Sequence, residues 1–231
     1  MNTSAVALFC AIAIGLAAAK LSGSGTTTRY WDCCKPSCSW KENTGTHDAV
    51  ASCSIDGVTK VNASVTSGCD SDGSAYVCND MQPWSVNDTF AYGFVAASFT
   101  GGSDTSYCSV CLKLTFTESP LEGKTMIVQN VNTGSDLGEN QFDVQIPGGG
   151  VGIFTLGCST QWNSSTTGWG AQYGGISSDD DCDELPTELQ SGCHFRFGWY
   201  EDADNPTVDF EQVECPSEIT DITGSENNDD L

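Results

Sequence analysis

The 231-residue chain contains few basic residues, with 8 Lys and Arg against 31 Asp and Glu and a formal net charge of -23. A chain this acidic repels nucleic-acid backbones and anionic lipid headgroups. We therefore expect no nucleic-acid or membrane partner, and a neutral or cationic ligand fits the charge better. Hydrophobic residues make up 39% of the chain, which is enough for a folded core. For the oligomeric state, our default expectation is a monomer.

Histidine is also scarce, since only His47 and His194 occur, and no G-x-S-x-G motif is present. This argues against a Ser-His-Asp hydrolase and against a zinc site. Gly148–Gly150 is not followed by Lys and Ser or Thr, so it is not a phosphate-binding loop. The acidic run Asp179–Glu184 could hold calcium, but the start of a helix explains it better. We expect no metal and no cofactor.

Long apolar runs are absent except at the N-terminus, where Ala5–Ala19 is uncharged and ends in a small-x-small alanine pattern. That stretch is too short to span a bilayer comfortably, and the pattern is typical of a signal-peptidase site. We expect residues 1–19 to be a signal peptide of a secreted, extracellular protein. A flexible segment 20–27, one domain 28–216 and an acidic, frayed tail 217–231 would follow.

The cysteine count agrees with secretion. Of 13 cysteines, Cys10 lies in the expected signal peptide, which leaves twelve in the mature chain. An even number in a secreted protein predicts six disulfides. Sequons at Asn62, Asn87 and Asn163 are compatible with secretion but do not establish glycosylation.

The body of the chain reads mainly as short strands separated by Gly, Asn, Asp and Ser. The expected strands are Thr28–Cys33, Cys111–Thr117, Lys124–Asn130, Gln141–Ile146, Val151–Phe154, His194–Tyr200 and Phe210–Cys215. Ser85–Ala97 and Asp181–Leu189 look more helical. The pattern predicts a mainly β protein, with a barrel as its most suitable architecture.

Two of these strands carry carboxylates on defined faces. In Gln141–Ile146, alternation places three apolar residues on one face and leaves Asp143 on the other. In Arg29–Cys33, Tyr30 and Asp32 share a face. Paired carboxylates across a cleft are the usual apparatus of glycoside hydrolysis, although 31 acidic residues allow many pairs.

Longer motifs make the case more specific. The segments Thr28–Cys38, Pro83–Asn87, Gly134–Gly138, Phe142–Phe154, Tyr173–Ser178 and Ala203–Pro206 occur in the order and spacing of one family. Over roughly residues 27–216, the chain resembles glycoside hydrolase family 45, secreted endo-β-1,4-glucanases. The resemblance implies a six-stranded double-psi β-barrel with an open groove, long disulfide-pinned loops and a few short helices.

The resemblance also implies single-displacement hydrolysis with inversion. Asp32 would be the general base, Asp143 the general acid, and Asp136 an auxiliary carboxylate near the acid. An inverting pair must leave room for water, so the two catalytic carboxyls should lie about 6.5–9.5 Å apart. Their environments should differ, so that Asp143 stays protonated while Asp32 is ionised.

The same resemblance suggests sugar-binding residues. Tyr30 and Trp40 match groove positions that offer flat apolar faces to glucose, and Lys35, Asp204 and Asn205 match polar contacts. Trp31 and Tyr173 are open to either interpretation, since each could bind sugar or pack in the core.

The disulfide pairing comes from the resemblance alone. It implies the pairs Cys33–Cys158, Cys34–Cys69, Cys38–Cys108, Cys53–Cys78, Cys111–Cys215 and Cys182–Cys193. The family's common fungal form has one further bridge, whose positions correspond to Ser109 and Ser225, so we expect a looser C-terminal tail. Gln141 stands where relatives often have His, which leaves the pH optimum open.

Two rival functions remain at this stage. One is a non-hydrolytic, expansin-like wall-loosening protein with a similar barrel, although such proteins lack the carboxylate that corresponds to Asp32. The other is the same hydrolase acting on glucomannan, xyloglucan or mixed-linkage glucan. The sequence favours endo-cleavage of amorphous or soluble cellulose.

Overall fold

A closed β-barrel forms the body of the protein in a computed structural model, which describes residues 20–101 and 105–228. The expected signal peptide, residues 1–19, lies outside this described part. The strands are β1 (Ser22–Tyr30), β2 (Trp84–Asn87), β3 (Phe90–Ser98), β4 (Cys111–Phe116), β5 (Thr125–Asn132), β6 (Gln141–Gln145) and β7 (Thr207–Val213). Six of them close in the order β3-β5-β4-β7-β1-β6, with β6 pairing back onto β3, while β2 extends β3 on the outside. The expected six-stranded barrel is confirmed.

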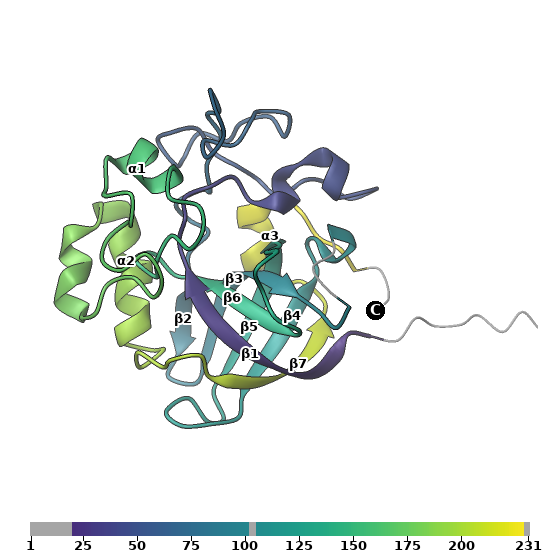
Figure 1. The fold of residues 1–231 in the computed structure, drawn as a ribbon. Coiled ribbons are helices and arrows are strands. Elements are labelled where there is room, and N and C mark those ends of the chain that lie inside the picture. The colour runs from purple at the N-terminus through teal and green to yellow at the C-terminus, as the bar shows by residue number, and fades with distance from the viewer. Residues whose placement is uncertain (1–19, 102–104, 229–231) are drawn as a thin grey trace, which may run out of the picture.

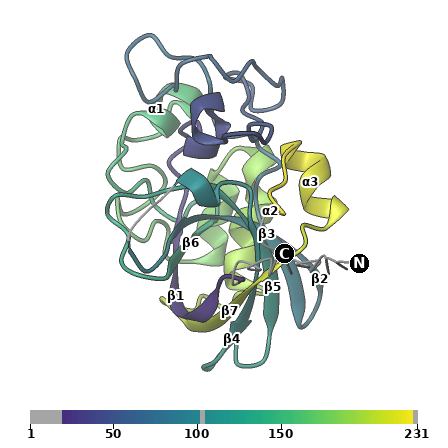
Figure 2. The ribbon, with the colours of Figure 1, turned by 90° about the vertical axis from the view of Figure 1, so that its right-hand side faces the viewer.

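Strand β6 closes the barrel between β1 and β3. It runs parallel to β1 and antiparallel to β3. Helices and 3₁₀ turns lie around the barrel, and the longest loops gather at one end (Figures 1 and 2). These are α1 (Gly157–Trp162), α2 (Thr187–Phe197), α3 (Ser217–Thr223), η1 (Ser37–Ser39), η2 (Lys41–Asn43), η3 (Thr105–Tyr107) and η4 (Asp179–Glu184). Within residues 20–101 and 105–228, no helix is long and apolar enough to cross a membrane.

The barrel interior is built by alternation along each strand. Leu112, Leu114 and Phe116 of β4 are buried inside with Phe142 and Val144 of β6. A second core, rich in cystines, fills the space between the barrel and its loops and contains Trp31 and Met81. The loops that carry the groove are therefore anchored to a packed layer of their own.

All six expected disulfides are present. They join Cys33–Cys158, Cys34–Cys69, Cys38–Cys108, Cys53–Cys78, Cys111–Cys215 and Cys182–Cys193. Among these cysteines, Cys111 is the one that lies in a named strand, so the bridges mainly hold loops and helices. Such a framework is consistent with a protein of an oxidising compartment.

Three of the secondary-structure predictions were wrong. Ser85–Ala97 is the β2–β3 hairpin and not a helix; β3 is buried on both faces, so its nearly continuous apolar run hides the two-residue period. His194–Tyr200 lies largely in α2, which begins directly after Pro186 and is tied to η4 by the Cys182–Cys193 bridge. Val151–Phe154 is a turn, with Gly152 at φ 56°.

Both ends of the domain are more ordered than the sequence indicated. Instead of a flexible segment at 20–27, residues 22–26 pair with β7 as part of β1, a long-range pairing that local propensity cannot report. Instead of fraying, residues 217–223 of the tail form α3, and Ser225 beyond it is buried. The Ser225 hydroxyl lies 2.6 Å from the Ser109 hydroxyl. A hydrogen bond therefore joins the two positions at which the family's common fungal form has its further disulfide.

Candidate functional site

Asp143 lies at the centre of the parallel and antiparallel pairings of β6. Its Cα partners are Thr28 on β1 and Ala96 on β3. Its neighbours Phe142 and Val144 are fully buried in the barrel, so alternation turns Asp143 to the opposite face. One carboxylate oxygen of Asp143 is buried without a hydrogen-bond partner. The face-by-face prediction for this strand is confirmed.

Asp32 follows two residues after the end of β1, in a tightly constrained turn. Cys33 has a φ of 64°, a left-handed conformation that costs energy in a non-glycine residue, and its bridge to Cys158 holds it there. Gly157 approaches so closely that a Cβ would lie 2.3 Å from the Asp32 carbonyl oxygen. The Cys34 backbone N–H donates to the Asp32 carboxylate at 2.9 Å.

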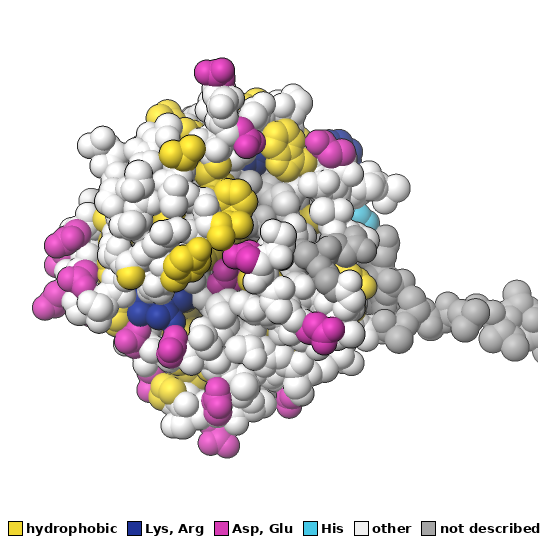
Figure 3. Space-filling view, viewed as in Figure 1, with side chains coloured by type: hydrophobic (Ala, Val, Ile, Leu, Met, Phe, Trp, Pro, Cys, Tyr) yellow, Lys and Arg dark blue, Asp and Glu magenta, His cyan; other side chains and the backbone are white. Residues whose placement is uncertain are grey.

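Two adjoining cavities meet at these carboxylates. Both are lined by Tyr30, Asp136 and Asp143, and Asp32 lines one of them. Figure 3 shows acidic side chains in this hollow, beside a row of hydrophobic side chains and a small group of Lys and Arg side chains. The structure thus brings the three predicted carboxylates into one groove.

The two buried carboxyls differ in acidity. Burial raises the pKa of Asp143 to about 7, and the nearby charges of Asp136 and Asp32 raise it further, while the Thr28 hydroxyl and Arg29 act in the opposite direction. Burial raises the pKa of Asp32 to about 6, opposed by its hydrogen bond from Cys34. Between these values, Asp143 is mainly protonated and Asp32 mainly ionised.

Tyr30 lies close to both carboxyls, and its hydroxyl is held by two amides. The side-chain amides of Asn132 and Gln145 each donate to the Tyr30 oxygen at 3.0 Å. Burial and the charge of Asp32 hold the pKa of Tyr30 well above its usual value. Because both lone pairs of the oxygen are occupied, the hydroxyl hydrogen is left as a donor near the carboxyls.

The groove also carries an ion pair that includes Arg29, a residue that local sequence patterns did not mark as functional. Arg29 donates to Asp204 at 3.2 Å, and both line the groove with Asn205. The Arg29 Nε atom is buried and has no partner. Its place inside the Arg-Tyr-Trp-Asp run, in a chain with so few cations, was the signal that could have identified it.

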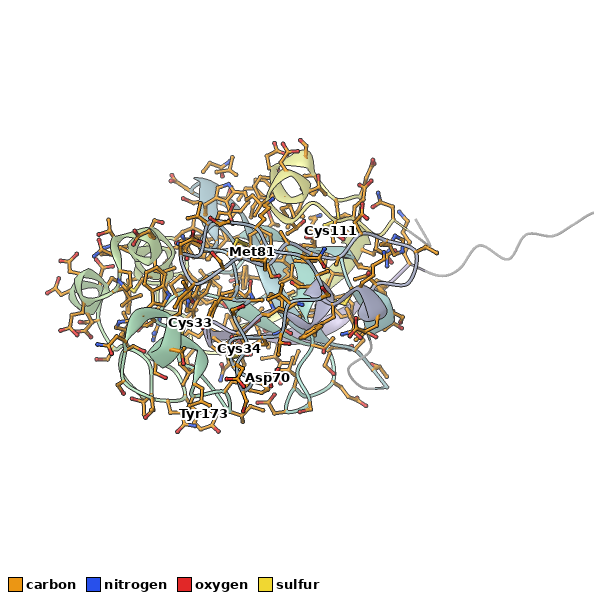
Figure 4. The ribbon with its side chains drawn as sticks, turned by 90° about the horizontal axis from the view of Figure 1, so that it is seen from above. Cys33, Cys34, Asp70, Met81, Cys111 and Tyr173 are labelled. Carbon is orange, nitrogen blue, oxygen red and sulfur yellow. A yellow bond between two sulfur atoms is a disulfide. The ribbon has the colours of Figure 1, made fainter. Side chains whose placement is uncertain are left out.

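Trp31 and Tyr173, which the sequence left open to either interpretation, lie in different environments. Trp31 is buried in the cystine-rich core, so it packs. Tyr173 lines the groove and is 66% exposed, and it points outward on the side of the molecule where Asp70 also lies (Figure 4). Ile153 and Phe154 are also exposed and line the second cavity, so the turn that carries them offers an apolar wall.

Lys35 and Trp40 lie away from the cavities around Asp143. The Lys35 ammonium donates to the carbonyls of Ala63 and Val65 at 2.6 and 2.8 Å and sits 3.4 Å from the centre of the Trp40 ring. With its ammonium engaged in this way, Lys35 supports Trp40 and the loop around Val65. We had expected Lys35 to contact a sugar hydroxyl, and its ammonium is poorly placed to do so.

One cluster of metal-ligating residue types lies outside the groove. Asp179, Cys182 and His194 are the only such cluster in the described ranges 20–101 and 105–228, but Cys182 is bridged to Cys193 and is not available as a thiolate. In the same run, Asp181 accepts a backbone hydrogen bond from Ser178 at 3.1 Å. The acidic run thus begins a 3₁₀ helix, as the sequence analysis favoured.

Known proteins resemble this chain in both sequence and fold. Residues 24–226 match the model of glycosyl hydrolase family 45. An endoglucanase of Phaedon cochleariae is 55% identical over 205 residues, covering 88% of this chain and 84% of that protein. An endoglucanase of Cryptopygus antarcticus is 51% identical over 215 residues, covering 93% of this chain and 92% of that protein.

The fold has a solved counterpart. The crystal structure of the cellulase from the Antarctic springtail Cryptopygus antarcticus superimposes with a TM-score of 0.85 at 50% identity, covering 90% of this chain and 99% of that one. The chain spans only 58% of the length of a Fusarium oxysporum relative to which it is 50% identical over 220 residues. On the family match and these identities, the chain belongs to glycosyl hydrolase family 45.

Proposed function

We propose that this glycoside hydrolase is a secreted endo-β-1,4-glucanase that cuts internal bonds of amorphous or soluble cellulose with inversion. The observation that carries the proposal is that Asp143 and Asp32 are both buried, both have a raised pKa and line one groove in unlike surroundings, since the Cys34 N–H donates to Asp32 while one oxygen of Asp143 has no partner. Two carboxyls set apart in this way are suited to acid and base roles in glycosidic cleavage. The endoglucanase names of the relatives support the same activity.

In the proposed reaction, Asp143 donates its proton to the glycosidic oxygen as the bond to the anomeric carbon breaks. Asp32, ionised and fixed by the Cys34 N–H at 2.9 Å, takes a proton from the water that attacks the opposite face of the sugar. Each residue ends with the other's starting protonation, and solvent exchange restores both. Asp136, which lines both cavities, would act by its charge near the acid.

Substrate binding would use the length of the groove. The exposed ring of Tyr173 and the apolar Ile153 and Phe154 offer surfaces for the C–H faces of glucose, while Asp204 and Asn205 offer polar contacts. Tyr30 would donate its hydroxyl hydrogen near the bond that is cut. Trp40, backed by Lys35, would extend the binding surface.

The domain organisation is part of the proposal. Residues 1–19 would be removed as a signal peptide, and the catalytic domain of an extracellular monomer would extend beyond the expected 28–216 to include the start of β1 at Ser22 and the α3 segment to Ser225. Six disulfides are consistent with that compartment. An N-terminal sequence starting near Lys20 in protein recovered from culture medium would support it, and a retained Met1 would contradict it.

The rival functions differ in what they require of the site. A wall-loosening protein without hydrolysis needs no base, whereas here Asp32 is held in a strained, disulfide-anchored turn beside the groove. Other β-glucans would be cut by the same two carboxyls, so the site does not distinguish these substrates. The preferred substrate must be identified by comparing hydrolysis rates.

The direct test is viscosity loss and reducing-end release on carboxymethyl cellulose, with wild type beside Asp143→Asn. We expect a rapid fall in viscosity with new reducing ends from the wild type and neither from the variant. Side-by-side rates on glucomannan, xyloglucan and mixed-linkage glucan then rank the substrates. Absence of reducing ends from every glucan would overturn the proposed hydrolysis.

A further inference from the structure

The side-chain amide of Gln141 connects the loop that carries Asp136 to the strand beside Asp143. The backbone N–H of Gly138 donates to Gln141 Oε1 at 2.8 Å, and Gln141 Nε2 donates to the Thr28 hydroxyl at 3.0 Å. Gly138 lies two residues after Asp136 in its loop, and Thr28 is the Cα partner of Asp143 across the parallel β1–β6 pair. One amide thus links the loop of Asp136 to the strand that pairs with Asp143.

Hydrogen-bond roles leave only one arrangement for this chain of groups. A backbone N–H can only donate, so the carbonyl end of the Gln141 amide must face Gly138 and its NH₂ must face Thr28. The Thr28 oxygen therefore accepts from Gln141, and its single hydrogen is directed elsewhere. Thr28 is the Cα partner of Asp143 on the adjacent parallel strand, and its hydroxyl acts to lower the pKa of Asp143, which makes the Asp143 carboxylate the acceptor to test for that hydrogen.

We propose that Gln141 is a positioning residue for the acid, which orients the Thr28 hydroxyl toward Asp143 and holds the Asp136 loop against the same strand. The inference rests on the proposed role of Asp143 as general acid. It assigns a task separate from substrate contact to a side chain that lines the groove.

The effect on Asp143 has a definite sign. The charged groups that face it are Arg29 from β1, Asp32 from the turn after β1 and Asp136 from its loop. The phenols of Tyr30 and Tyr200 are its other titratable neighbours. β3 contributes the uncharged Ala96. A hydroxyl that donates to the carboxylate stabilises its charged form and lowers the pKa of Asp143. Without Gln141, that donor is no longer held in place, and the pKa of Asp143 rises.

The test measures the titration of Asp143 directly, by carbon NMR of the aspartate carboxyls in the full mature protein without substrate. Asp143→Asn identifies the signal. We expect Gln141→Met, which fills similar space, and Thr28→Val, which keeps the shape, each to raise the pKa of Asp143 by about 0.5–1 unit. The double variant should shift no further than Thr28→Val alone, because both act through one hydroxyl.

The pH dependence of kcat/KM gives a second readout, since its alkaline limb should move upward by the same amount in both variants. Gln190→Met is the matched control, because it removes two hydrogen bonds, to the carbonyls of Asp183 and Leu185 remote from the groove, and should leave the titration unchanged. No shift in Gln141→Met, or a double variant whose shift equals the sum, would overturn the inference. If instead the titration shifts as expected but Asp143→Asn hydrolyses glucan normally, the proposed function fails and the hydrogen-bond chain stands.

Discussion

The hydroxyls of Ser109 and Ser225 lie 2.6 Å apart in the interior and join the segment before β4 to the end of the chain. Ser225 also donates to the Asp48 carbonyl, and its own carbonyl accepts from Gln129 at 2.8 Å. The C-terminal segment is therefore fixed by a buried polar network at the positions where the resemblance had suggested a missing covalent bridge.

A covalent bridge should be restorable at these positions. Ser109→Cys with Ser225→Cys is expected to form a seventh disulfide and to stabilise the protein by ~2–4 kcal/mol, less where the six native bridges already restrict the unfolded chain. Thiol titration and thermal unfolding measure the two effects. Each single cysteine variant is the control and should be less stable than wild type; free thiols in the double variant would contradict the geometry.

Activity should depend on pH through the two carboxyls. As pH rises through about 6, Asp32 becomes ionised and kcat/KM increases; as pH passes about 7, Asp143 loses its proton and kcat/KM falls. We expect a narrow bell centred between these values for a soluble glucan oligosaccharide. A flat profile from about pH 4 to about pH 9 would exclude both assignments.

Asp143→Asn should make the protein more stable in neutral solution. The folded-state pKa of Asp143 lies above the ordinary aspartate value of 3.8, so the wild type loses stability as pH rises from about 4 through about 7. Replacing the carboxyl by a neutral amide removes that loss, with an expected gain of roughly 2–4 kcal/mol at about pH 8. Thermal unfolding in mildly alkaline and in acidic buffer tests this, since the gain should be nearly absent at about pH 4.

Tyr30→Phe should affect both folding and catalysis. The substitution removes the oxygen that accepts from Asn132 and Gln145, leaving two amide donors without a partner at a cost of about 1–3 kcal/mol. Chemical denaturation measures that loss, and kcat should fall because a donor near the carboxyls is gone. Tyr107→Phe is the control, since Tyr107 lines neither of the two cavities at the carboxyls and its loss of a hydroxyl should leave kcat unchanged. An unaltered stability of Tyr30→Phe would contradict the network.

Local sequence predicted the site better than it predicted the loops. The alternation in Gln141–Ile146 correctly predicted that Asp143 points away from the core, because a strand buried on one face follows a two-residue period. The disulfide pairs and the six-stranded barrel needed the family resemblance, since composition alone leaves the connectivity of twelve cysteines open. That β1 and β6 are neighbours is a long-range fact that neither strand encodes locally.

The misjudged elements share a physical cause. β3 is buried on both faces, so its apolar run resembles a helix, and residues 22–26 form a strand only because β7 supplies the partner. Arg29 and Gln141 could be placed in the groove only once the pairing of β1 with β6 was known. For Lys35, no local pattern indicated that two loop carbonyls would occupy its ammonium.

The most direct measurement for the whole account is the anomeric configuration of the first products from a soluble β-1,4-glucan oligosaccharide, followed by proton NMR. Single displacement by Asp143 and Asp32 predicts that α-anomers appear first and β-anomers only later, by mutarotation. Asp32→Asn and Asp143→Asn should each slow product formation by about 10²–10⁴-fold with the fold intact. Initial β-anomers, or full activity in both variants, would contradict the account.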